Sequence, residues 1–460
     1  MRTEAIVVMG TLVASSCGNA DAFVCTADGQ CGGDGACEAS GYCSFLDDTC
    51  MSGRRYGDLA GALSGMCVGG GSTSDTGDST TSGSSTTTSS SGPDPDGGST
   101  SPSTTSSTTG LAETTSSGTD CDPVVGWWDC RWRARIPLEV LPPDGPLPQV
   151  PVGLFLDPMR IDYGLTGPGG VDLRVVAADG TTELPIEVDR WEHDGDSIVW
   201  FRIDDLDPRS TSMAWVYFDN PDAVAAGTAA AVWSNGYRAV WHLDGELADS
   251  VQAVPDCVDE GVLSVSGLFG EGQAPVRGGW ADCGQVGLEG LFVGGGTITA
   301  WVNPDDGGGS GSGRIVDKSG SAAPQGYALA VTANERIQFA RGHVNGLGLW
   351  RTPLGSVPFM QWSHVAVAYV ETGMGVPPQM HVDGVLQGLS MGSAPGGSVD
   401  AESEYPLAIG NNAPTGGRTF NGVIDEVRLS DGIRTPTWIA YEHEIGRDNV
   451  VSYGGVEVLN

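Results

Sequence analysis

The sequence predicts an all-β protein with two β-sandwich domains, and three observations lead to this fold class. Glycine and proline are abundant, with 71 and 27 residues among 460, whereas long helical patterns are nearly absent. Such a composition favours strands and turns. Short runs of β-branched and aromatic residues, separated by turn residues, fill the chain after residue 120. All 13 tryptophans also lie after residue 120, so we expect the packed cores there, in domains at 121–233 and 234–460.

The chain is strongly acidic, with 58 acidic residues, 22 basic residues and a formal net charge of −36. This charge repels phosphate backbones, so nucleic acid is excluded as a partner. It suits a secreted protein and could attract Ca²⁺. A solvated acidic surface explains the same charge without any specific ion.

Residues 1–16 predict a signal peptide, because Arg2 precedes an apolar run at 5–14 that is too short to span a bilayer as a stable helix. Small residues and then Cys17 follow, and this arrangement resembles the lipobox of bacterial lipoproteins. The resemblance implies that Cys17 becomes the first mature residue and carries a lipid that anchors the protein in the cell envelope, at the outer membrane or cell surface. Ala14 stands where that family usually has Leu. Ordinary signal-peptide cleavage is therefore the alternative.

The number of cysteines supports lipidation, because the chain has 11 cysteines and an even set remains when Cys17 is set aside. Residues 17–68 contain six of them and too few apolar residues for a core, so disulfides must hold this segment together. These six are Cys25, Cys31, Cys37, Cys43, Cys50 and Cys67. Fifteen pairings remain open. Zinc is the competing interpretation, but the segment has no histidine and lacks the usual ligand spacing.

The four remaining cysteines lie in the two expected sandwiches, two in each. We predict the disulfides Cys121–Cys130 and Cys257–Cys283, because each is the only local pairing within its domain. Between the cysteine-rich segment and the first sandwich, residues 69–120 consist almost entirely of Ser, Thr, Gly, Asp and Pro. No apolar period offsets the entropy of ordering, so we expect a disordered stalk.

Residues 121–233 predict a compact sandwich, in which Asp179-Gly180 joins two strands as a hairpin. This region resembles the bacterial domain of unknown function 2341. The resemblance rests on residues 132–138 (WRARIPL), 172–181 (DLRVVAADGT) and 215–221 (WVYFDNP). No activity is established for that family, so the resemblance implies a fold and no chemistry.

Residues 234–460 contain strand blocks at 237–244, 297–304, 362–369, 380–386 and 420–430. Their order and spacing resemble the laminin-G-like, concanavalin A-like jelly roll. Thr435-Pro436, after the last block, predicts the start of one short helix. The resemblance implies a domain that binds extracellular ligands, with glycans favoured because sandwiches of this type commonly bind them.

One pattern suggests catalysis, since Glu187, Asp189 and Glu192 match the Glu-x-Asp-x-x-Glu motif of a concanavalin-like glycosidase family. Retaining glycosidases need two carboxylates about 5 Å apart. Strand alternation, however, places Glu187, Asp189 and Trp191 on one face, opposite a buried face with Ile186 and Val188. We therefore expect the carboxylates on a flat, solvated outer surface that suits hydrolysis poorly.

No other catalytic set emerges. The six histidines are scattered singly along the sequence and are expected to be structural. Calcium is the best cofactor candidate, because laminin-G-like domains often hold one ion at the rim of the sandwich. Asp249 follows the opening strand, where such a ligand often lies, whereas Asp425 is expected to be structural. Ca²⁺ needs six to eight oxygens, so one Asp is weak support.

The sequence therefore predicts a cell-surface binding or adhesion lipoprotein that recognises a glycan or another extracellular ligand and has no catalytic residues. The first alternative is a polysaccharide hydrolase that uses Glu187, Asp189 and Glu192. The second is a structural protein of the envelope.

Overall fold

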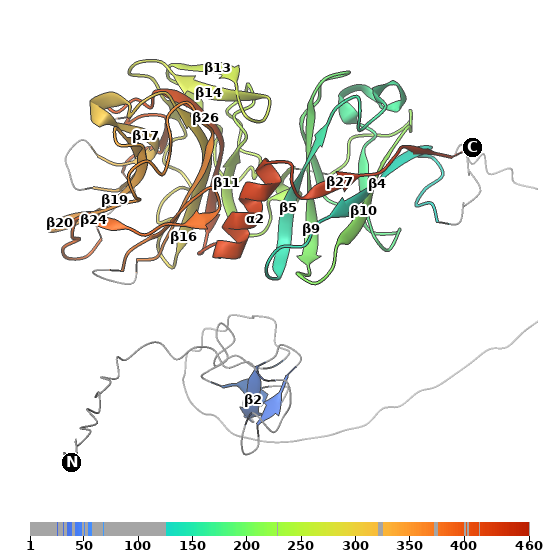
Figure 1. Ribbon diagram of the computed structural model, residues 1–460, viewed down its shortest axis with the longest axis horizontal. Coiled ribbons are helices and arrows are strands. Elements are labelled where there is room, and N and C mark those ends of the chain that lie inside the picture. The colour runs from blue at the N-terminus through green and yellow to red at the C-terminus, as the bar shows by residue number, and fades with distance from the viewer. Residues whose placement is uncertain are drawn as a thin grey trace, which may run out of the picture. The chain divides into compact units, whose positions relative to one another are not determined.

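The computed structural model describes residues 126–459, apart from 228, 321–324, 372–375, 400–401, 403 and 414, together with residues 25, 31, 35–38, 42–47, 50, 54–57 and 68 (Figure 1). The chain divides into two compact units, residues 1–112 and 113–460. The predicted signal peptide, lipidated Cys17 and stalk lie outside the described residues. The all-β fold class with two sandwiches is confirmed, since the elements of residues 126–459 are nearly all strands.

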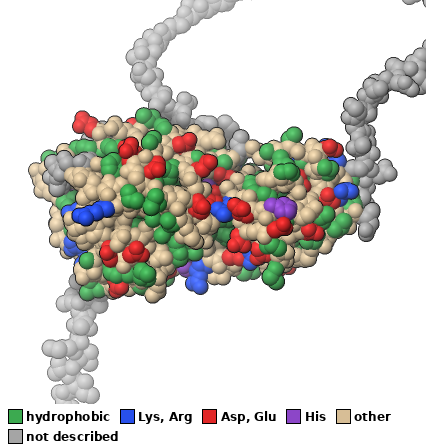
Figure 2. All heavy atoms as spheres, turned by 90° about the horizontal axis from the view of Figure 1, so that it is seen from above, with side chains coloured by type: hydrophobic (Ala, Val, Ile, Leu, Met, Phe, Trp, Pro, Cys, Tyr) green, Lys and Arg blue, Asp and Glu red, His purple; other side chains and the backbone are tan. Residues whose placement is uncertain are grey.

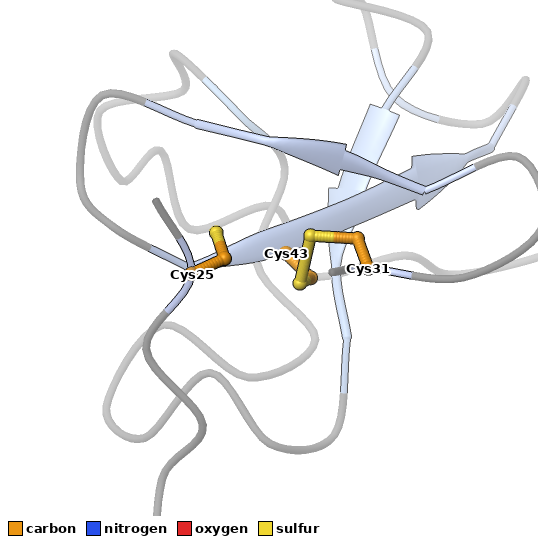
Figure 3. A group of neighbouring side chains, drawn as sticks. All are labelled: Cys25, Cys31 and Cys43. Carbon is orange, nitrogen blue, oxygen red and sulfur yellow. A yellow bond between two sulfur atoms is a disulfide. The ribbon is translucent and has the colours of Figure 1, made fainter. Parts of the chain in front are cut away.

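The N-terminal unit contains a small antiparallel sheet of β1 (Ala36–Cys37), β2 (Cys43–Leu46) and β3 (Arg54–Tyr56). The disulfides Cys25–Cys37 and Cys31–Cys43 hold it together, and Cys50 is also disulfide-bonded. The side chains of Cys25, Cys31 and Cys43 lie close together (Figure 3). The zinc interpretation is wrong for these three residues, because their sulfurs are bonded to other sulfurs and are not free thiolates.

The first sandwich consists of two antiparallel sheets. One has the order β27-β4-β10-β6-β7, with β28 also on β4, and the other has the order β5-β9-β8. The strands are β4 (Ala134–Val140), β5 (Leu147–Leu156), β6 (Arg174–Ala177), β7 (Glu183–Leu184), β8 (Ile186–Arg190), β9 (Ser197–Leu206), β10 (Ser212–Phe218), β27 (Val451–Tyr453) and β28 (Glu457–Val458). The short helical elements are η3 (Tyr163–Leu165), η4 (Pro168–Gly170) and α1 (Ala229–Val232). The Asp179-Gly180 hairpin is confirmed, because β6 pairs with β7 across it.

The second sandwich also consists of two antiparallel sheets. One has the order β13-β14-β26-β16-β21-β22-β23, with β11 on β26, and the other has the order β12-β15-β25-β17-β18-β19-β20-β24. The first sheet contains β11 (Tyr237–Trp241), β13 (Val262–Ser266), β14 (Glu271–Pro275), β16 (Gly296–Pro304), β21 (Ser363–Tyr369), β22 (Gln379–Val382), β23 (Val385–Leu386) and β26 (Gly422–Asp431). The second contains β12 (Val258–Asp259), β15 (Ala281–Asp282), β17 (Ser312–Lys318), β18 (Tyr327–Thr332), β19 (Arg336–His343), β20 (Gly346–Arg351), β24 (Ser390–Ser393) and β25 (Ala408–Ile409), with η5 (Gly309–Gly311) before β17. The predicted Cys257–Cys283 disulfide joins the start of this domain and is confirmed. Cys130 is disulfide-bonded as well, whereas its predicted partner Cys121 lies outside the described residues.

The helix predicted at Thr435-Pro436 is α2 (Pro436–Gly446), and the Thr435 side chain caps it by accepting a hydrogen bond from the Trp438 amide at 3.1 Å. Figure 1 shows α2 between the two sandwiches. Trp438, Tyr441 and Ile445 of this helix belong to the hydrophobic core of the first sandwich, and so does Trp301 of β16. The two sandwiches of the C-terminal unit therefore share one continuous core.

The boundary expected for the second sandwich is wrong at its C-terminal end. The last residues return to the first sandwich, where Val451 pairs with Val140 and Glu457 pairs with Arg135 (Figure 1). The physical reason is the open edge of β4, whose backbone groups gain partners from β27 and β28. The first domain is consequently built from two separate stretches of sequence.

In the part of the chain that the structure describes, no helix is both long enough and apolar enough to cross a bilayer.

Candidate functional site

The outer face of the β16–β26 sheet is covered and does not face solvent. Arg428 of β26 lies under the Trp200 ring of β9, with 4.6 Å between the guanidinium carbon and the ring centroid. Thr299 of β16 donates a hydrogen bond to Glu442 of α2 at 2.7 Å. The first sandwich and α2 therefore bury polar side chains that belong to the second sandwich.

The expectation for Glu187 and Asp189 is wrong, because their side chains are only 10% and 7% exposed. Alternation along β8 does place both carboxylates on one face, but the second sandwich covers that face. His242, directly after β11, lies opposite both of them. A sequence pattern within one strand cannot reveal such a cover, because it comes from a segment some fifty residues further along.

His242 is the centre of a buried ionic cluster. Its Nδ1 lies 2.7 Å from Glu426 Oε1 and 3.5 Å from Asp189 Oδ2, and its Nε2 lies 3.3 Å from Glu187 Oε2. Glu187 also accepts a hydrogen bond from the Trp233 indole. The prediction that the histidines lie singly is therefore wrong for His242, which interacts with three carboxylates.

A bulge in β26 brings Glu426 into this cluster. The register between β16 and β26 shifts between Thr299 and Trp301, and Glu426 adopts a φ of 51°. A bulge adds one residue to a strand and redirects its side chain. Asp425 and Glu426 are both buried, and the Asp425 Oδ2 caps the amides of Leu268 and Phe269 at 2.8 and 3.0 Å. Asp425 therefore has a structural role, as expected.

The cluster changes the pKa values of its members. Burial, reinforced by the charges of Glu426 and Glu187, raises the pKa of Asp189 to about 7. Burial alone would lower the pKa of His242, but the carboxylates of Asp189, Glu426 and Glu187 hold it well above its usual value. Burial likewise opposes ionisation of Glu187, but the charge of His242 lowers the pKa of that carboxyl.

A polar cavity of about 440 Å³ opens beside the cluster. Its lining includes Glu187, Asp189, His242, Asp244, Glu246 and Ser250. Glu192 is not brought into the cavity, since its side chain is 56% exposed and pairs with Arg190. The structure therefore unites Glu187 with Asp189 but does not assemble the three-carboxylate set expected for a hydrolase.

A second cavity, of about 460 Å³, has mostly aromatic walls. Its lining is Phe155, Leu268, Phe269, Trp301, Trp362, Asp383, His443, Gly446, Arg447 and Asp448. These residues come from β5 of the first sandwich, from strands and loops of the second, and from the end of α2. Sequence reasoning missed this cavity, because its residues are scattered over some three hundred positions.

The aromatic rings of this cavity hold one another in place. Phe155 stacks on Phe269 with 5.5 Å between centroids, and Phe269 meets the edge of Trp301 at 6.0 Å. Trp301 stacks on His443 at 5.5 Å. The β22–β23 turn supplies Asp383, whose Oδ1 accepts a hydrogen bond from the His364 amide at 2.9 Å. The cavity is thus a preformed apolar surface with charged groups at its edge.

Asp249, the predicted calcium ligand, is buried and organises the loop after β11. Its Oδ1 accepts hydrogen bonds from the amides of Val240 and Val251, and its Oδ2 from those of Ala253 and Val254. These four bonds explain why an Asp stands there without any ion. Calcium at Asp249 stays a prediction.

The chain matches two family models, and both are the families expected from its sequence. Residues 285–440 match the concanavalin A-like lectin/glucanases superfamily, and residues 169–247 match the domain of unknown function DUF2341. The class of protein is therefore a two-sandwich protein that carries a concanavalin A-like domain.

Three solved structures illustrate the fold similarity. Domain 4 of AbnA, an extracellular GH43 arabinanase from Geobacillus stearothermophilus in complex with arabinotriose, matches over 45% of this chain and 97% of its own length, with 18% identity and a TM-score of 0.31. The binding domain of paraclostridial mosquitocidal protein 1 matches over 45% of this chain and 52% of its own, with 9% identity and a TM-score of 0.37. The receptor-binding domain of botulinum neurotoxin mosaic serotype C/D matches over 45% and 51%, with 11% identity and a TM-score of 0.36. The chain thus spans about half the length of the two toxin domains. A search among curated proteins finds no significant match.

Proposed function

We propose that this protein is an extracellular glycan-binding protein whose ligand occupies the aromatic cavity at the junction of the two sandwiches. The observation that carries the proposal is the combination of four aromatic side chains with charged groups at one preformed cavity of about 460 Å³. A volume of this size accommodates a small organic ligand such as a short oligosaccharide.

The chemistry of a sugar suits this wall. A pyranose ring presents a face of C–H groups that packs on an aromatic ring, while its hydroxyls donate and accept hydrogen bonds at the edge. Trp362 is half-buried and lines the cavity, and its indole N–H has no hydrogen-bond partner among the described residues. Trp362 therefore offers both an apolar face and a free donor.

The edge of the cavity supplies the polar contacts. Asp383 and Arg447 are both exposed, and the Arg447 guanidinium forms no hydrogen bond or ion pair within the described part of the chain. A carboxylate and a guanidinium together can accept from and donate to neighbouring hydroxyls. The match of residues 285–440 to a superfamily of lectins and glucanases supports the same ligand class by analogy of fold.

Attachment to the cell envelope is part of the proposal. A lipid on Cys17 and the Ser/Thr-rich segment 69–120 would hold the binding domains away from the membrane. Mass spectrometry of the mature N-terminus decides this point, because an unmodified N-terminus that begins elsewhere contradicts the anchor.

The experiment for the glycan is an array of plant, microbial and mammalian oligosaccharides, probed with the full chain in the presence of Ca²⁺ and again with a chelator. We expect saturable binding to a restricted set of glycans, and dependence on Ca²⁺ would support the ion at Asp249. Release of reducing sugar from the same panel would favour the hydrolase alternative. Absence of any glycan binding would contradict the proposal and favour a structural envelope protein.

A further inference from the structure

We propose that Asp189, His242 and Glu426 form a binding site for a divalent transition-metal cation, on the wall of the polar cavity between the two sandwiches. This site is separate from the aromatic cavity and goes beyond the proposed glycan binding. It would join the sandwiches directly, because Asp189 belongs to β8 of the first and the other two residues belong to the second.

The donor atoms of the three residues converge on one point. One nitrogen of His242 and one carboxylate oxygen each from Asp189 and Glu426 all lie within 4.8 Å of one another. The individual distances from His242 Nδ1 are 2.7 Å to Glu426 Oε1 and 3.5 Å to Asp189 Oδ2. An ion in the middle of such a triangle reaches all three donors with small side-chain adjustments.

Neighbouring groups hold the remaining atoms of these residues. Arg428 binds the other oxygen of Glu426, with 2.7 Å between Nη2 and Oε2, and so leaves Oε1 directed at His242. The Nε2 of His242 faces Glu187 at 3.3 Å. A carboxylate on the far nitrogen of a histidine fixes the ring and its tautomer, an arrangement that metal-binding histidines almost always have.

An independent observation indicates a missing ligand. The Asp189 side chain is only 7% exposed and lines the cavity, yet its Oδ1 accepts no hydrogen bond from any described residue. A buried carboxylate oxygen without a partner is costly. A cation, or water bound to one in the adjacent space of about 440 Å³, would satisfy it.

The donor set and the charge select the kind of ion. An imidazole nitrogen with two carboxylates suits zinc or a similar first-row ion, whereas Ca²⁺ prefers oxygens alone. Three carboxylates here face one imidazole and one guanidinium, so a divalent cation supplies the positive charge that the cluster lacks. Three protein ligands leave at least one position open toward the cavity.

Isothermal titration of the chelator-treated full chain with ZnCl₂ tests this site. We expect one saturable site in the wild type and affinity at least about 100-fold weaker in Asp189→Asn, which keeps the shape of the side chain but removes its charge. Glu187→Gln should weaken binding by roughly 10- to 100-fold, as is typical when the partner of a metal-bound histidine is altered. His193→Asn is the matched control, because His193 lies on the surface beside Asp194 at 2.9 Å and should leave the affinity unchanged.

The inference is overturned if the wild type shows no saturable zinc binding, if Asp189→Asn binds as tightly as the wild type, or if His193→Asn removes the site. Zinc-edge X-ray absorption of the wild type provides a readout that needs no variant. One imidazole with oxygen ligands and no sulfur is expected, whereas sulfur or several imidazoles would place the ion elsewhere and contradict the assignment.

Discussion

His381 of β22 is a histidine without polar partners. It is fully buried, and neither ring nitrogen has a hydrogen-bond partner within residues 126–459 as described. Burial, together with the charge of nearby His364, lowers the pKa of His381 to about 4. The ring is therefore neutral in the folded protein at pH 7, whereas histidine in an unfolded chain titrates near 6.5.

This difference predicts loss of stability in mild acid. Between pH 6.5 and 4 the unfolded chain binds a proton that folded His381 does not, so the free energy of unfolding falls with pH by up to about 3 kcal/mol and this contribution levels off below pH 4. Urea unfolding at pH 7 and 4.5 measures the effect. His381→Gln should flatten the pH dependence, while His193→Gln, at an exposed histidine, should not. An identical slope in the wild type and His381→Gln would show that His381 does not cause it.

Strand β8 shows how far the sequence alone could lead at the scale of one element. Its existence, its alternation and the shared face of Glu187 and Asp189 were all predictable, because the period of a strand is local. The burial of that face was not predictable, because His242 and Glu426 come from distant strands. The bulge at Glu426 also escapes prediction, since no glycine marks its positive φ.

The same contrast applies to disulfides and the helix. The Cys257–Cys283 pair and the start of α2 followed from local sequence, and both are confirmed. The return of β27 to β4 did not follow, because residues 451–453 carry no feature that assigns them to a domain more than two hundred residues earlier.

Tyr453 of β27 links this returning strand to the aromatic cavity. Its hydroxyl accepts a hydrogen bond from the Phe155 amide at 3.0 Å. We expect Tyr453→Phe to reduce the free energy of unfolding by about 1–2 kcal/mol, because the Phe155 amide then loses its acceptor. Denaturant unfolding measures this change.

Tyr327 provides the matched control for this prediction. Its side chain is equally buried, but its hydroxyl has no hydrogen-bond partner among the described residues. Tyr327→Phe should therefore be neutral or stabilising. A larger loss in Tyr327→Phe than in Tyr453→Phe would contradict the assigned role of the Tyr453 hydroxyl.

At the scale of the whole molecule, acidic side chains are spread over the face shown in Figure 2, with few basic ones among them. This distribution agrees with a net charge of −36 and keeps anionic partners at a distance. A ligand for this surface is therefore neutral or cationic, which is compatible with a neutral glycan.

Both candidate sites lie where the two sandwiches of the C-terminal unit meet. The aromatic cavity combines Phe155 of β5 with Trp301 and Trp362 of the second sandwich, and the ionic cluster combines Asp189 with His242. The sequence predicted each domain from its own strand pattern. Sites formed by contacts between domains depend on relative placement, which no local pattern contains.

Ligand binding by Trp362→Ala tests the central claim most directly, with Trp280→Ala as the control. Trp280 is also half-buried in the second sandwich but lies outside the aromatic cavity. Titration of a glycan that binds the wild type on the array should show affinity reduced about 30-fold or more in Trp362→Ala, since removing an aromatic anchor costs roughly 2 kcal/mol. Circular dichroism verifies that both variants are folded. The account predicts wild-type affinity in Trp280→Ala, and equal affinity of folded Trp362→Ala and the wild type would contradict the aromatic cavity as the binding site.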